Sequence, residues 1–284
     1  MLVYFSFFAL LSLFLHPAPV AANPGTPPEG EDPAGSECPH CQDNDSAISR
    51  LLEEVDSLYS SFKSQEAEKV LLKIIELDPN HKEGLIKLAR VYIDLGDMIP
   101  ESTAGWKEQR IKQYHIAEKF ARKAVATDPN GTWGHFYLAA SLGKVAMHSS
   151  ISEQLDLAPK IRGETKKAIA LDPDNGFAHH ILGVWNRRVA GINRLNRFLA
   201  NTFLWRSVPD GSLEKSMEHL KRAISLNPAN ITHHLELAKT YVAMGKQQLA
   251  ISHLHKVQEL SIQFSDDPLH KENARHLLQE LKEK

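Results

Sequence analysis

The two cysteines of the 284-residue chain stand together in Cys38-Pro39-His40-Cys41, where two thiols flank an imidazole. Such a group could close a local disulfide, exchange disulfides with another protein, or supply part of a metal site. A zinc site needs four ligands, and only His40 stands near the two thiols. The surrounding sequence therefore favours a disulfide between Cys38 and Cys41, or a solvated loop.

This tetrapeptide resembles the redox site of the DsbA type of thioredoxin-like oxidase. In those proteins the first cysteine starts a helix within a βαβ unit, and this context lowers the pKa of its thiol. Here no strand-like segment precedes Cys38, and Gln42 stands where a c-type haem motif requires histidine. A redox-active pair and a metal-linked or partner-dependent role remain as alternatives.

Three of the 15 histidines, His135, His179 and His234, each stand six residues after a proline. Histidine can bind metal, but a zinc site needs ligands that converge within about 2.1 Å of one point. We therefore expect each ring to pack between helices, with its N–H satisfied by the backbone. The neighbouring His180 and His233 suggest pairs with one buried and one groove-facing member.

The sequence contains no Gly-rich phosphate loop, no His-Glu-x-x-His helix and no Gly-x-Ser-x-Gly turn. We therefore expect a non-enzymatic protein without a cofactor. The net charge of −2 creates no global field that would select nucleic acid as a partner.

The elements that position these residues follow from a repeated phrase in which a helix-like run ends in Asp-Pro or Asn-Pro. Proline cannot continue a helix, because it lacks the N–H and restricts the residue before it. The Asp or Asn beside it can cap the next helix. The chain is therefore an all-α array of paired helices. The four prolines are Pro79, Pro129, Pro173 and Pro228.

This rhythm resembles the tetratricopeptide repeat, a helix–turn–helix unit of 34 residues. Leu226 and Leu260 are 34 residues apart, whereas the earlier units exceed this length by 16, 10 and 21 residues. We expect a superhelix of about five helix pairs with long insertions inside the repeats, and a capping helix from Pro268 to Lys284. The insertions fall near Asp97–Lys112, Ser149–Ala158 and Gly191–Gly211.

Repeat alignment places Ala124, Ala168 and Ala223 at one position, where we expect buried helix–helix contacts. The insertion at 191–211 is amphipathic and basic if it is helical. We favour its packing on the array, with contact to a membrane or to a partner helix as the alternative.

Two stretches, Ala178–Trp185 and Leu213–Ala223, resemble the regulator of microtubule dynamics family. Members carry a similar His-His-Leu-Gly-x-Trp helix, a long insertion and a proline-capped final unit. The resemblance extends over residues 46–284. It implies an all-α tetratricopeptide-like fold and a role as scaffold or adaptor.

The first 45 residues differ in composition from the repeats. Residues 1–22 are apolar, uncharged and end in small residues, which is typical of a secretory signal. An uncut anchor at Met1–Leu15 is the alternative. Residues 23–45 hold five prolines and little to bury, which predicts a disordered linker. We therefore expect an exported protein, periplasmic or secreted, with a repeat domain over 46–284.

The tetratricopeptide resemblance also implies a concave groove, lined by the first helix of each unit and binding a protein or peptide. Between Asn175 and Pro209 five arginines occur without any acidic residue, so these arginines lack local counter-ions and we expect an acidic partner. Because exposed charges contribute little to stability, we expect little effect on melting when Arg187 and Arg188 are changed to glutamate. The alternative function is a redox or metal-linked protein acting through Cys38 and Cys41. The predicted partner-binding residues are Arg90, Trp133, Phe136, Lys144, Phe177, His180, Arg187, Arg188 and Lys239.

Overall fold

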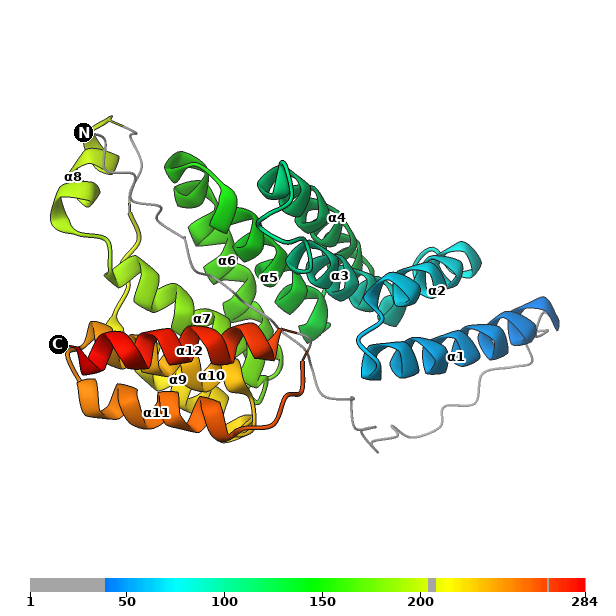
Figure 1. The fold of residues 1–284 in the computed structure, drawn as a ribbon. Helices are drawn as coiled ribbons and strands as arrows, with labels where there is room; N and C mark the ends of the chain where they lie inside the picture. The colour runs from blue at the N-terminus through cyan, green and yellow to red at the C-terminus, as the bar shows by residue number, and fades with distance from the viewer. Residues whose placement is uncertain (1–38, 204–207, 265, 284) are drawn as a thin grey trace.

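The computed structural model describes residues 39–203, 208–264 and 266–283. Within them, helices joined by turns and loops are the only regular secondary structure. Five antiparallel pairs follow one another in a right-to-left stack in Figure 1: α1 with α2, α3 with α4, α5 with α6, α7 with α9, and α10 with α11. The predicted all-α superhelix of five helix pairs is confirmed. The helices are α1 Pro39–Ser60, α2 Ser64–Leu77, α3 Lys82–Asp97, α4 Trp106–Thr127, α5 Thr132–His148, α6 Ile151–Leu171, α7 Gly176–Ala190, α8 Arg194–Phe203, α9 Leu213–Leu226, α10 Ile231–Ala243, α11 Gln247–Glu259 and α12 Asp267–Lys282.

Three of the four turns between repeats are built by the aspartate before the proline. The carboxylate of Asp78 accepts the backbone N–H of Asn80 at 2.9 Å, and Asp128 and Asp172 repeat this contact two residues ahead. Asn175 and Asn230 then cap the next helices through their side-chain oxygens. The turn and the cap satisfy backbone groups that a helix end leaves without partners, which explains why the phrase recurs.

Small residues allow the two helices of a pair to approach closely. Ala124 is 3% exposed, and Ala168 and Ala223 are fully buried, as the alignment predicted. On α9 the small, buried Ser216 also lets the next repeat approach, since it shares a 3.0 Å hydrogen bond with Thr240 of α10. Gly183 is required on the facing helix α7, because a Cβ there would lie 2.6 Å from the Leu220 side chain.

The three insertions take different forms. The first is a short loop followed by the 22-residue helix α4, whose Arg110 donates to the carbonyl of Ile99. The second extends α6 to 21 residues, with a capping box between Ser150 and Glu153. The third contains α8, at the upper left of Figure 1.

The described part of the third insertion packs on the array, as predicted. Arg197 on α8 donates to the carbonyls of Val189 and Pro209. Ala200 and Val208 are buried in the common core. The side chains of Leu195, Phe198, Leu199 and residues 203–207 lie outside the described residues, so a membrane contact of this insertion stays a prediction.

The N-terminal boundary of the helical domain needs correction. Helix α1 begins at Pro39, seven residues before the predicted start at Ser46. After Pro39, which suits the first turn of a helix, residues 40–48 contain no proline or glycine to interrupt it. The predicted signal and residues 23–38 of the predicted linker lie outside the described residues. Among the helices that the structure describes, none combines the length and the apolar character that a membrane span requires.

The last helix, α12, covers the end of the stack. It packs against α11 and α10, with Ala274, Leu278 and Leu281 buried and Glu280 exposed. The predicted capping helix is therefore confirmed, and it begins one residue earlier, at Asp267. A repeat array needs such an element to cover its last apolar face.

Candidate functional site

The first helices of successive repeats enclose a groove of about 870 Å³, called here the concave groove. Side chains from α1, α3, α5 and α7 line it, and the segment before α12 borders it. Arg90, Trp133 and Phe177, three of the predicted partner-binding residues, lie in this lining. The full lining comprises Asp56, Tyr59, Ser60, Phe62, Lys82, Glu83, Ile86, Lys87, Arg90, Trp133, Tyr137, Phe177, Asn227, Asn230, Gln263 and Phe264.

An aromatic cluster forms the apolar wall of the concave groove. The Trp133 ring lies 5.4 Å from Phe136, 6.3 Å from Tyr137 and 6.5 Å from Phe177, between centroids. Phe136 is fully buried and supports the wall from behind, whereas Trp133 is partly exposed. Rigid aromatic side chains of this kind offer a large contact area at a small entropic cost.

Next to this wall lies a polar floor. The Arg90 guanidinium carbon lies 4.0 Å from the centroid of the Tyr59 ring, and Arg90 Nε lies 3.9 Å from the Asp94 carboxylate. The hydroxyl of Tyr137 is buried and has no hydrogen-bond partner among the described residues. Burial raises the pKa of both Tyr59 and Tyr137, against the opposing charge of Arg90. Both phenols are therefore neutral donors at physiological pH.

Three predicted partner-binding residues are not available on the groove surface. Phe136, Lys144 and His180 are each fully buried. For these residues the prediction of a surface contact is wrong, because the repeat offset fixes a helix face but not how deeply a neighbouring repeat covers it. They support the groove from beneath.

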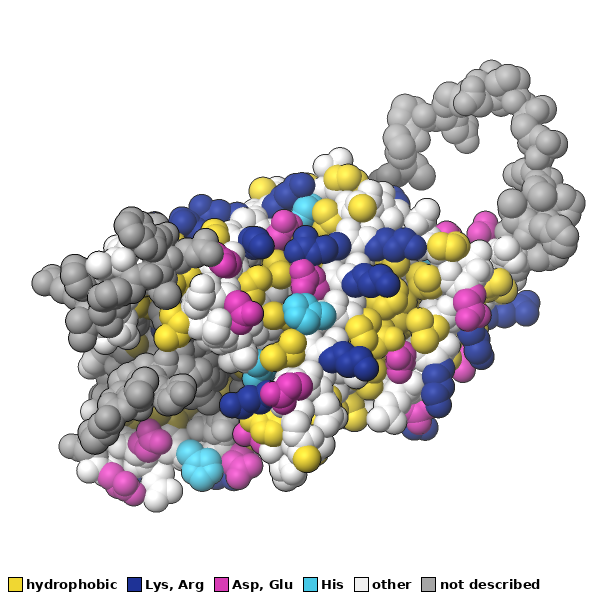
Figure 2. Space-filling model, turned by 90° about the horizontal axis from the view of Figure 1, so that it is seen from above, with side chains coloured by type: hydrophobic (Ala, Val, Ile, Leu, Met, Phe, Trp, Pro, Cys, Tyr) yellow, Lys and Arg dark blue, Asp and Glu magenta, His cyan; other side chains and the backbone are white. Residues whose placement is uncertain are grey.

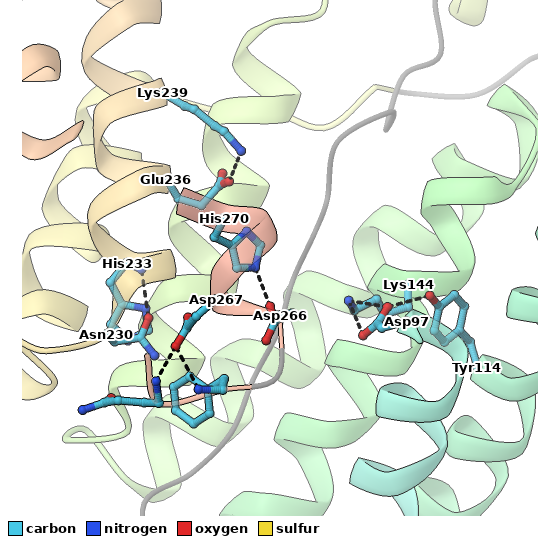
Figure 3. A network of polar contacts seen from close by, with 12 residues as sticks. Asp97, Tyr114, Lys144, Asn230, His233, Glu236, Lys239, Asp266, Asp267 and His270 are labelled. Carbon is cyan, nitrogen blue, oxygen red and sulfur yellow. Dashed lines mark hydrogen bonds and ion pairs between the residues drawn. The ribbon is translucent and has the colours of Figure 1, made fainter. Parts of the chain in front are cut away.

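Lys144 belongs to a buried ion pair that joins two repeats. Its ammonium donates to both oxygens of Asp97, at 2.8 and 2.9 Å, and the hydroxyl of Tyr114 donates to the same carboxylate at 2.7 Å (Figure 3). Burial raises the pKa of Asp97 to about 6, against the opposing effects of Lys144 and Tyr114. Burial lowers the pKa of Lys144, and the carboxylates of Asp97 and Asp266 oppose this shift.

A second cluster surrounds Glu236 on α10. Arg187 on α7 donates to one oxygen of its carboxylate, and Lys239 donates to the other at 2.6 Å. Burial alone would raise the pKa of Glu236, but Lys239, Arg187 and Arg188 together hold it well below its usual range. Burial lowers the pKa of Arg188 to about 9, and the charge of Arg187 adds to this shift.

The structure thus corrects the prediction that the arginines lack local counter-ions. Glu236 neutralises Arg187, and Arg197 lies 3.8 Å from Asp210. The sequence interval between Asn175 and Pro209 holds no acid, but the partner of Arg187 comes from the next repeat. Reversing the charges of Arg187 and Arg188 is therefore expected to destabilise the fold, contrary to the prediction from sequence.

The three repeat histidines are bound as predicted. The Nε2–H of His135, His179 and His234 donates to the carbonyl of the proline six residues earlier, at 2.9 to 3.0 Å. In each unit Nδ1 contacts the second helix: Glu164 at 2.6 Å, and His219 and His253 at 3.0 Å each. In His179 and His234, Nε2 carries the proton, so in the neutral ring Nδ1 is an acceptor. The Nδ1–H groups of His219 and His253 must therefore donate to it.

The adjacent histidines form a further pair. His180 and His233 lie on neighbouring first helices, with their Nδ1 atoms 3.0 Å apart, and both are fully buried. The prediction that one member faces the groove is wrong, because α7 and α10 pack directly on each other here. Burial lowers the pKa of His180 to about 4; Glu236 opposes the shift, while His270, Arg187 and Lys239 add to it.

The lowered pKa values of the buried histidines predict that the fold loses stability in acid. A base whose pKa is lower in the folded state contributes full stability above its unfolded pKa of about 6.5, and this contribution falls as pH drops toward 4. For His180 alone the loss by pH 4 is about 3 kcal/mol. Burial likewise lowers the pKa of His233 and brings that of His253 to about 4, whereas protonation of Asp97 acts in the opposite direction.

Urea unfolding at pH 7.5 and pH 5.0 measures this effect, and we expect the free energy of unfolding to be lower at pH 5.0. The variant His180→Asn should show a smaller difference between the two pH values. An equal or greater stability at pH 5.0 would contradict the assignment.

The cysteine motif lies at the edge of the described structure. Cys38 and the side chain of Cys41 lie outside the described residues, so the disulfide stays a prediction. Within the described ranges, no group of three or more His, Cys, Asp or Glu side chains could hold a metal ion.

No single charge dominates the described part of the face seen in Figure 2. On the face seen in Figure 2, lysine and arginine side chains alternate with acidic and apolar ones. This pattern agrees with the net charge of −2.

Some residues of the groove were not predicted. Tyr59, Tyr137 and Phe264 line it. Glu236, which pairs with Arg187 and Lys239, was not predicted either, and these three residues lie outside the groove lining. Tyr137 and Glu236 each stand eight residues after a repeat proline, one position beyond the predicted residues Phe136 and His180, which stand seven residues after theirs. Phe264 lies outside the repeats, and no periodic signal could have indicated it.

The helix pairs, the turns and the concave groove define a tetratricopeptide-repeat superhelix. A solved structure of a thermophilic tetratricopeptide-repeat protein from Thermus thermophilus is similar, with a TM-score of 0.58 at 17% identity, over 80% of this chain and 98% of that one. PilW, a type IV pilus biogenesis factor, gives a TM-score of 0.52 at 16% identity, over 84% of this chain and 90% of that one.

Within this class the sequence identifies a particular family. The family model described as Regulator of microtubule dynamics protein 1-3 matches residues 51–282, and the chain belongs to this family. Regulator of microtubule dynamics protein 1 of Bos taurus is 25% identical over 238 residues, which cover 84% of this chain and 73% of that protein. Protein 3 of Rattus norvegicus is 25% identical over 244 residues, covering 83% of this chain and 50% of that protein.

Proposed function

We propose that the chain is a non-enzymatic scaffold that holds a segment of another protein in the concave groove. The observation that carries this proposal is the joint lining of the groove by Arg90, Trp133 and Phe177, which come from three successive repeats. An extended peptide presents alternate side chains to such a row of pockets. Apolar side chains would pack on Trp133 and Phe177.

The charges of the groove lining, three cations (Lys82, Lys87 and Arg90) against two carboxylates (Asp56 and Glu83), favour a partner segment that also carries acidic residues. Outside the lining, the two cations Arg187 and Lys239 share the single carboxylate of Glu236. An incoming carboxylate would balance this excess of positive charge through charge-assisted hydrogen bonds. Binding should therefore weaken as the salt concentration rises.

Selection of random dodecapeptides on the full chain, followed by titration of an enriched peptide, tests this function. The variants Trp133→Leu and Arg90→Gln should each weaken binding by about tenfold, or roughly 1.4 kcal/mol. The matched control is Ile151→Ala, which truncates a 47% exposed apolar side chain on α6. Enriched peptides that bind all variants equally, or the absence of enrichment, would contradict the proposal.

The compartment is a separate proposal, and it rests on the composition of residues 1–22. We propose export through a secretory signal in this segment. Mass spectrometry of the mature N-terminus tests it: a start near Asn23 supports export with cleavage, whereas retention of Met1–Leu15 would contradict cleavage.

The alternative function through Cys38 and Cys41 stays a prediction. A strongly depressed thiol pKa, measured by the pH dependence of alkylation, would favour a redox role. An ordinary thiol pKa near 8.5, or a stable disulfide, would favour the scaffold.

A further inference from the structure

The first turn of α12 and the residues before it form an acidic turn, defined here as the described residues of 263–270. The carboxylate of Asp267 accepts the backbone N–H groups of Gln263 and Phe264 at 2.7 and 2.8 Å, which folds the segment back on the helix. Asp267 is 1% exposed, although aspartate is mostly found on protein surfaces. Gln263 and Phe264 also line the concave groove, so the acidic turn forms one of its borders.

The charged groups of the acidic turn face first helices of the array. His270 Nε2 lies 2.6 Å from the Asp266 carboxylate, and His270 is fully buried (Figure 3). The Asp266 charge acts on Lys144 of α5, and the His270 charge acts on His180 of α7. Gln263 and Phe264 share the groove lining with Trp133 of α5 and Phe177 of α7, and α12 packs against α10. The turn therefore borders these three first helices.

We propose that the acidic turn can leave the surface formed by α5, α7 and α10. The partner is then an acidic segment that begins a helix and binds to this surface in place of the turn. This inference rests on the proposed scaffold function and specifies both its partner and its regulation. Asp266 and Asp267 precede Pro268 at the start of a helix, where acidic side chains and proline are favoured. A partner segment with two adjacent acids at the start of a helix could fold its own preceding loop through the second acid, as Asp267 does, and present the first acid to the surface of α5, α7 and α10.

The resident turn has a kinetic and thermodynamic advantage, because it is tethered to the site. A short tether gives an effective concentration in the millimolar range. A partner of ordinary affinity therefore binds weakly to the parent chain and much more tightly once the turn is released.

The full chain with Asp266→Lys tests this inference, because the new cation would face Lys144. Hydrogen exchange should become faster in residues 260–284 and stay unchanged in α3 to α7. A labelled synthetic peptide with the sequence of residues 260–284 should then bind this variant at least about tenfold more tightly than the parent. The same peptide carrying Asp266→Lys should not bind.

The matched control is Glu280→Lys, the same charge change on the exposed face of α12, which should bind the peptide like the parent. Asp267→Asn is a second variant, which removes a charge from the clamp on the loop amides without adding a cation. If neither variant releases α12 locally, or if released chains bind the peptide no better, the acidic turn is only a structural cap and the inference is wrong. Enriched dodecapeptides that still depend on Trp133 would then leave the scaffold function standing, whereas loss of that dependence would contradict the function itself.

Discussion

Replacing Ala168 by glutamate is expected to destabilise the protein by about 3 to 5 kcal/mol. Ala168 lies on α6, is fully buried, and belongs to the common core with residues of α5 and α7. A longer charged side chain at this position must either bury a carboxylate without a partner or separate the helices. Both outcomes disrupt the array, because each repeat is held only by its neighbours.

The matched control is Ala170→Glu, which makes the same change two residues further along α6 at an exposed position. Chemical unfolding followed by circular dichroism should show a large loss for the first variant and almost none for the second. Similar stabilities for both variants would show that the repeat alignment assigns the wrong face of α6.

Replacing Lys144 by methionine should cost about 3 kcal/mol at neutral pH, because it leaves the Asp97 carboxylate buried without its cation. The pH dependence of this cost distinguishes an electrostatic effect from a packing effect. The pKa of Asp97 is already about 6 with Lys144 present, and it should rise further in the variant. At pH 5 Asp97 can therefore become neutral, and the cost should be smaller than at pH 8.

Urea unfolding of the parent and of Lys144→Met at both pH values measures this difference. Lys166→Met, an exposed lysine on α6, is the control and should have little effect at either pH. A cost that is the same at pH 5 and pH 8 would contradict the assigned role of the ion pair.

The repeat frame could be predicted from sequence because its determinants are local and periodic. A proline follows each of four second helices, and the Asp directly before three of these prolines builds the turn. An Asn two residues after two of the prolines caps the next helix, and small residues recur on the second helix. These features need no knowledge of distant contacts. The backbone partners of His135, His179 and His234 were predictable for the same reason.

The polar contacts of the site could not be predicted, because they join residues from different repeats. Arg187 and Glu236 are 49 positions apart, and Lys144 and Asp97 are 47 apart. No sequence interval indicates such a pair until the superhelix places the helices together. Consequently, buried Lys144 and His180 were assigned to the surface of the groove.

The insertions show a related limit. Their lengths follow from the spacing of the prolines, but length alone does not distinguish a longer helix, as in α6, from a separate element such as α8. The start of α1 at Pro39 was missed because few apolar residues mark its first turns.

Hydrogen exchange of the full chain, with and without an enriched dodecapeptide, tests most directly whether the concave groove binds a segment of another protein. We expect the peptide to slow exchange in the groove-lining first helices α3, α5 and α7. In the second helices α2 and α4, only residues that contact these first helices should be protected. Protection confined to the second helices, or spread evenly over all repeats, would contradict binding in the groove.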